Sequence, residues 1–189
     1  ILSPLYPWRY PESVTLLARW SQQVYPELCV ELYQETGQEC EWTPSGLLIL
    51  ETEEQAAARA WAAHYGYVVE VLDATQVQRL APALGRPVPA LWLPQLGQVR
   101  NPRLAKALTL SLQRHGVGVL THTEITGFVL EGERVAGVQT RRGALQAKAV
   151  VLTAGAWSMP LLRGLGLELA LAPIRGQMAL LRANPDLLT

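Results

Sequence analysis

Apolar residues recur every three or four positions over the first part of the chain, the spacing that lines one face of a helix. This pattern predicts a helix with the following inner positions: Val14, Leu17, Ala18, Ser21, Tyr25, Leu28 and Leu32. Pro26 is expected to kink or restart this helix because proline lacks a backbone N–H. Gly37 is placed where a helix end favours a left-handed residue, so the helix is expected to stop there.

Two further helices have recognisable start signals. Thr52 and Gln55 form the pattern of a capping box and precede an Ala-rich segment that extends to about His64. Asn101 precedes Pro102, which suits an N-cap followed by the first helical position. Both segments are therefore predicted to be helical.

The second half of the chain carries strand patterns. The turn sequences EGER at 131–134 and RRGA at 141–144 separate alternating segments. Residues 124–148 are therefore predicted to form an antiparallel three-stranded meander. The stretch AVVLTAGA at 149–156 is continuously apolar, which is typical of a strand buried on both faces of a parallel sheet.

This apolar stretch ends on small residues, Ala154 and Gly155, with the bulky Trp157 close behind them. Ligands of open α/β sheets bind beyond the carboxyl ends of the strands. A glycine at that position lets a cofactor approach the backbone closely. The alternative is a plain turn, because many buried strands end in glycine where the chain reverses.

Composition narrows the class of protein. The 189 residues are 49% hydrophobic and 17% charged, which is typical of a globular protein and excludes a disordered one. The net charge is zero, which argues against a nucleic-acid partner. Cys29 and Cys40 are too few for a disulfide framework, which favours a reducing, cytoplasmic location. We expect no membrane span, since no run approaches about 20 apolar residues, and no metal site, since the three histidines are scattered.

Several stretches occur in the order seen in one enzyme family. They are ILSPLYPWRYP, ETGQECEWTPSGLLIL, LPQLGQVRNPRLAKAL, HGVGVLTHTEITGF, VVLTAGAWS and LAPIRGQMALL. Together they make the chain resemble the FAD-dependent amino-acid oxidases, the family that includes D-amino-acid oxidase, sarcosine oxidase and the glycine oxidase of thiamine biosynthesis. Each motif alone is moderately specific, and their shared order is what carries the resemblance.

The resemblance implies a mixed α/β (α+β) fold of the FAD-dependent amino-acid oxidase type. Part of an FAD domain would be joined to part of a substrate domain built on an antiparallel sheet. Residues 1–40 would be a helical segment adjoining the FAD domain, and residues 99–167 would belong to that domain. Residues 41–98 and 168–189 would belong to the substrate domain.

The resemblance also implies contacts with FAD. The backbone of Ile125 would lie beside the adenine or its ribose, and Ile1 and Leu2 would lie close to the isoalloxazine ring. Three more residues would line the FAD cleft: Ala154, Gly155 and Trp157. The alternatives are a core strand residue at 125, a packed aromatic at 157 and a chain end at 2.

The implied activity is oxidation of the carbon–nitrogen bond of glycine or another small amino acid or amine, giving an oxo acid, ammonia and hydrogen peroxide. A flavoprotein resembling D-amino-acid dehydrogenase is the alternative within the class, and a homo-oligomer stays open. The sequence lacks the Gly-x-Gly-x-x-Gly loop that cradles the FAD pyrophosphate, and no catalytic residue is assigned. Two hypotheses follow: an internal fragment of an active oxidase, or a truncated, non-enzymatic fragment that binds no FAD.

Overall fold

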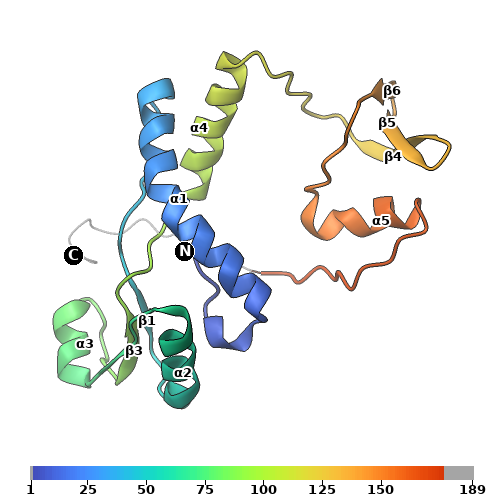
Figure 1. The fold of residues 1–189 in the computed structure, drawn as a ribbon. Coiled ribbons are helices and arrows are strands. Elements are labelled where there is room, and N and C mark those ends of the chain that lie inside the picture. Colours follow the sequence, from blue (N-terminus) through green and yellow to red (C-terminus); the bar gives the residue numbers. More distant parts are fainter. Residues whose placement is uncertain (1, 177–189) are drawn as a thin grey trace. The chain divides into compact units, whose positions relative to one another are not determined.

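The computed structural model describes residues 2–176, which form two compact units (Figure 1). Within these residues the first unit extends to Gly118 and the second begins at Val119. The elements of the first unit are η1 (Pro7–Arg9), α1 (Glu12–Thr36), β1 (Leu47–Ile49), α2 (Gln55–Tyr65), β2 (Glu70–Leu72), α3 (Ala74–Leu80), β3 (Ala90–Leu93) and α4 (Asn101–Arg114). Those of the second are β4 (Ile125–Glu131), β5 (Arg134–Thr140), β6 (Gly143–Gln146), η2 (Gly155–Trp157) and α5 (Ser158–Arg163).

An antiparallel sheet of order β1-β3-β2 forms the centre of one part of the first unit. Alternate side chains of β3 point to opposite faces. Leu91 and Leu93 pack in a cluster with Trp61 of α2, whereas Ala90 packs in another with Val77 of α3. Figure 1 accordingly shows α2 and α3 on opposite sides of strands β1 and β3.

Helices α1 and α4 pack against each other around a separate cluster of buried side chains. Its members are Cys29, Leu32, Cys40 and Ala107. At their carboxyl ends, the Glu35 carboxylate accepts a hydrogen bond from Ser111 Oγ at 2.8 Å and lies 3.1 Å from Nδ1 of His115. Helix α1 continues through Pro26 as one element. It ends at Gly37, whose φ is 72°, as predicted.

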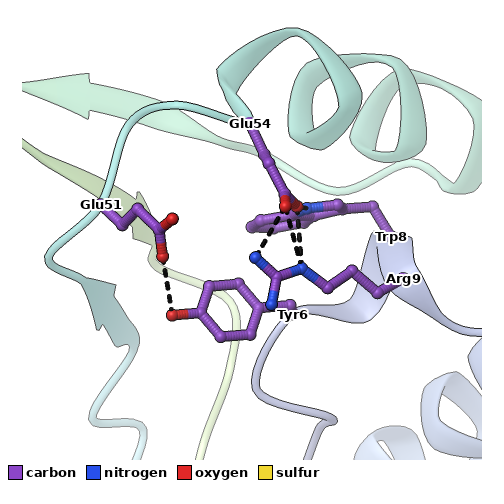
Figure 2. A network of polar contacts seen from close by, with 5 residues as sticks. All are labelled: Tyr6, Trp8, Arg9, Glu51 and Glu54. Carbon is purple, nitrogen blue, oxygen red and sulfur yellow. Dashed lines mark hydrogen bonds and ion pairs between the residues drawn. The ribbon is translucent and has the colours of Figure 1, made fainter.

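A network of polar contacts joins η1 to the segment before α2 (Figure 2). Glu54 accepts hydrogen bonds from Arg9, at 2.7 Å to Nη2, and from the indole N–H of Trp8. Arg9 also lies over the ring of Tyr6, 3.8 Å from its centre, and Tyr6 donates to Glu51 at 3.0 Å. The hydrogen bond to Glu51 raises the pKa of Tyr6, and the bonds from Arg9 and Trp8 lower the pKa of Glu54.

Two predicted helix caps are wrong in detail. The N-cap of α2 is Glu54 and not Thr52, and no side chain caps this helix. The physical reason is that the Glu54 carboxylate binds Arg9, which lies 45 positions earlier in the chain. This long-range contact holds the backbone at the start of the helix in place of a local capping box. Helix α4 begins at Asn101 itself, with Arg100 as its N-cap.

The second unit contains the predicted meander, an antiparallel sheet of order β4-β5-β6. The predicted buried strand at 149–156 is wrong for the described structure. Residues 151–154 carry no strand assignment, and Val151 is 84% exposed. A buried parallel strand requires hydrogen-bonded neighbours on its flanks, and neither sheet of residues 2–176 includes this segment.

No helix within residues 2–176 has the length and apolar character needed to cross a membrane.

Candidate functional site

The second unit encloses a hollow of about 730 Å³ between strand β4 and the segment that follows the meander. This volume lies in the range of about 300–1,000 Å³ that is usual for small-molecule sites. The residues that line it are Glu124, Ile125, Thr126, Phe128, Val138, Val150, Val151, Leu152, Thr153, Ala154, Trp157, Pro160 and Leu161.

The sheet supplies one wall of this hollow. Phe128 of β4 lies opposite Val138 of β5 in the antiparallel register, and both line the hollow. Ile125 of β4 lies opposite Thr140 of β5 in the same register. Because cross-strand partners on one face lie within contact distance, the meander holds these wall residues in fixed relative positions.

The segment after the meander supplies the other wall. Residues 150–154 lead into η2, where Gly155 takes a left-handed φ of 54°. No atom lies within 4 Å of the point where a Cβ on Gly155 would sit. The glycine is therefore required by the backbone turn, and the space beside it is open.

Ten of the thirteen lining residues are apolar, and the other three are Glu124, Thr126 and Thr153. The side chain of Trp157 is 78% exposed although it is large and aromatic. Contiguous exposed apolar surface of this kind marks a binding site for a ligand or another surface. A planar ring system that covers Trp157 and Val151 would be favoured by about 25 cal/mol for each Å² of apolar area removed from water.

One charged pair stands at the edge of this hollow. Nε of Arg141 lies 2.7 Å from Oε2 of Glu124. Glu124 also lines a second, adjoining hollow of about 330 Å³ together with Arg141 and Arg142. Glu124 is the ionisable side chain common to both.

Three of the predicted cofactor contacts come together in the larger hollow: Ile125, Ala154 and Trp157. Gly155 follows Ala154 directly and is not in contact with the hollow. Leu2 lies in the first unit, where its N–H donates to the carbonyl of Gly97 at 3.0 Å and its carbonyl accepts from Nε2 of Gln22 at 2.7 Å. Ile1 lies outside the described residues.

The sequence-based prediction missed Glu124 and Phe128. Strict alternation along the strand could not have identified them, because a register shift between Ile125 and Gly127 interrupts it and residues 124–126 all line the hollow. The partner of Glu124 is likewise identified only by the structure, in which Nε of Arg141 lies 2.7 Å from its Oε2.

Comparison with known proteins gives consistent matches along the chain. Residues 1–188 match the sequence profile of the family described as "DAO: FAD dependent oxidoreductase". The chain is 45% identical over 190 residues to a glycine oxidase of Pseudomonas putida, covering 100% of this chain and 52% of that protein. A glycine oxidase of Pseudomonas aeruginosa is 41% identical over the same span, again with 52% of its length covered. The chain thus spans about half the length of the curated relatives it matches.

Solved structures show a similar fold. The crystal structure of glycine oxidase from Geobacillus kaustophilus matches with a TM-score of 0.70 at 30% identity, over 82% of this chain and 43% of that one.

Proposed function

Because this chain belongs to the DAO family of FAD-dependent oxidoreductases, we propose that the full-length protein oxidises the carbon–nitrogen bond of glycine or another small amino acid. The observation that carries this proposal is the 45% identity to a glycine oxidase over the whole chain. FAD supplies the hydride acceptor for such chemistry, and the expected products are an oxo acid, ammonia and hydrogen peroxide.

The residues of the larger hollow fit one ring-bearing end of FAD. The hollow has the volume of a small-molecule site, and Trp157 offers an uncovered aromatic face for stacking. The open space beside Gly155 leaves the backbone accessible. The pyrophosphate needs a different kind of site, a glycine-rich loop before a helix, which this sequence does not contain.

In this proposal each wall of the hollow has a separate task. Ile125, Ala154 and Trp157 hold and orient the ring system, and the apolar lining excludes water from it. Leu2, fixed through its backbone by Gly97 and Gln22, is proposed to lie near the isoalloxazine ring. The domain assignment of residues 1–40, 41–98, 99–167 and 168–189 and the cytoplasmic location are proposed on the same resemblance.

The test uses the purified full-length protein. We expect flavin absorption near ~450 nm and release of hydrogen peroxide on addition of glycine, sarcosine or D-alanine. Turnover with a quinone acceptor but without peroxide would instead identify a dehydrogenase. A colourless protein that takes up no added FAD would overturn the proposal and favour the non-enzymatic alternative.

A variant pair connects the activity to the hollow. Trp157→Ala is expected to weaken FAD binding roughly tenfold, because a stacked aromatic pair contributes about 0.5–1.5 kcal/mol beyond its buried area. Trp157→Phe keeps an aromatic face and is expected to bind FAD almost as the wild type does. Equal affinity in all three proteins would remove Trp157 from the site.

A further inference from the structure

Glu124 is the ionisable side chain in the lining of the larger hollow, whose other lining residues are uncharged. An ionised carboxylate only accepts hydrogen bonds. It therefore selects for ligand groups that donate, such as amines and hydroxyls, and against carbonyls and phosphates. The hydroxyls of Thr126 and Thr153 in the same lining can donate or accept, so Glu124 is the lining side chain that restricts a ligand group to the role of donor.

The sheet geometry fixes the position of this carboxylate. Ile125 lies opposite Thr140 in the antiparallel register, and the residues that flank this terminal pair, Glu124 and Arg141, meet through their side chains. The turn that carries Arg141 is itself held, since Thr140 Oγ1 accepts from the N–H of Arg142 at 3.0 Å and donates to the carbonyl of Gly143 at 2.7 Å. Arg141 in turn lies 2.7 Å from Oε2 of Glu124, which leaves Oε1 as an acceptor for a ligand.

The two ends of FAD differ in what they offer a carboxylate. The pyrimidine edge of the isoalloxazine ring presents two carbonyl acceptors on either side of a single N3–H donor, so a carboxylate there meets more acceptors than donors. The adenosine end carries an exocyclic amine and ribose hydroxyls, which are donors. A carboxylate beside the hollow therefore complements the adenosine end and repels the other.

We propose that Glu124 accepts a hydrogen bond from a donor of the adenosine part of FAD, and that Arg141 is a positioning residue which holds Glu124 in place. This inference rests on the proposed function, because it takes FAD as the ligand. It assigns cofactor selectivity to an ion pair at the start of the meander, separate from any residue that touches the substrate.

The meander offers a matched control. Glu131 and Arg134 form an ion pair at the opposite end of the same two strands, with Oε2 and Nη2 3.7 Å apart. Neither residue lines either of the two hollows beside Glu124. Substitutions in this pair act on the same sheet and change the net charge by the same amount as those at Glu124 and Arg141. They leave the proposed contact with FAD unaltered.

The experiment measures the Kd for FAD of the full-length apoprotein by quenching of flavin fluorescence. Glu124→Gln is expected to raise the Kd roughly tenfold, as expected for loss of a charge-assisted hydrogen bond at a partly exposed site. Arg141→Ala is expected to raise it a few-fold, because Glu124 remains but is no longer held. Glu131→Gln and Arg134→Ala are expected to leave it unchanged.

FMN, which has the flavin and lacks adenosine, separates recognition from folding. Glu124→Gln is expected to leave any FMN affinity unchanged, whereas a structural defect would weaken both flavins equally. An unchanged Kd for FAD in Glu124→Gln, or equal effects from the two ion pairs, would overturn the inference while peroxide release by the wild type upheld the proposed function. A wild-type protein that binds no FAD would overturn both.

Discussion

The two units of the chain differ in how completely they bury their apolar side chains. The first unit closes three clusters of buried side chains, and its central strand β3 has Leu91 and Leu93 each 1% exposed. In the second unit the described residues leave Val151 and Trp157 more than three-quarters exposed. What is rigid in the second unit is the meander, which is held by backbone hydrogen bonds and a fixed register.

This difference separates a framework from a binding surface. Side chains that are already packed have no free energy left to gain from a ligand, whereas uncovered ones do. Two of the most uncovered side chains of the second unit, Val151 and Trp157, line one hollow, and the meander supplies the wall opposite them. Four experiments test this difference between the two units.

The largest effect is expected in the packed sheet. Leu91→Ala should lower the free energy of unfolding by about 2–5 kcal/mol, because it leaves a cavity among residues that cannot relax fully. Leu130→Ala in β4 makes the same chemical change at a side chain that is 50% exposed, and should cost about 1 kcal/mol or less. Urea titration of the full-length apoprotein measures both, and equal costs would contradict the contrast.

The cysteines report whether the first unit is closed in solution. Burial, followed by the neighbouring Cys40, raises the pKa of Cys29 to about 11. Since only the thiolate is alkylated, its reaction with iodoacetamide at pH 8 should be slower than that of an ordinary thiol by on the order of a hundredfold. In concentrated urea both thiols should react at ordinary rates, and rapid labelling of the native protein would show that this core opens readily.

A backbone clash should damage the meander specifically. A Cβ added at Gly137 would lie 2.2 Å from the carbonyl oxygen of Leu145, so Gly137→Ala must push β5 and β6 apart. We expect a loss of about 1–3 kcal/mol. Gly127→Ala in the neighbouring strand meets no atom within 4 Å and serves as the control. Hydrogen exchange of the meander amides measures the effect, and similar exchange in both variants would count against a register-held wall.

The smallest effect is expected at the polar network between η1 and α2. Bonds from Arg9 and Trp8 depress the pKa of Glu54, so the network stabilises the protein above the ordinary glutamate range and this contribution is lost as the pH falls through the depressed pKa. The stability difference between wild type and Glu54→Gln should therefore be constant near neutrality and shrink below about pH 4. Glu53→Gln removes the neighbouring carboxylate, to which neither Arg9 nor Trp8 donates within the described residues, and serves as the matched control.

Local signals predicted much of this fold. The turns EGER and RRGA fix the meander because tight turns with glycine determine which strands pair. Gly37 ends α1 because its backbone takes the left-handed conformation that glycine adopts without strain. In both cases the cause lies within a few residues of the effect, so a local pattern suffices.

Where the cause is distant, local patterns were not enough. Thr52 has the right neighbours for a cap, but the position of Glu54 is decided by Arg9, 45 residues earlier. The apolar run after the meander has the composition of a buried strand, yet strand pairing depends on partners that the pattern does not contain. In the candidate site, Ile125, Ala154 and Trp157 line one hollow, and their contact with FAD stays a prediction. Glu124 is identified only by the structure, through this hollow and its ion pair with Arg141.

The strand order β1-β3-β2 has a consequence for synthesis of the chain. Within residues 2–176 both edge strands pair with β3, which is the last of the three to be made. The first two strands must therefore wait, unpaired, until residues 90–93 have left the ribosome, at about 5–20 residues per second. In the meander, by contrast, β5 and β6 each pair with the strand made just before them. The better-packed unit is thus the one whose sheet assembles only after a delay. During that delay its unpaired apolar strands are exposed to aggregation.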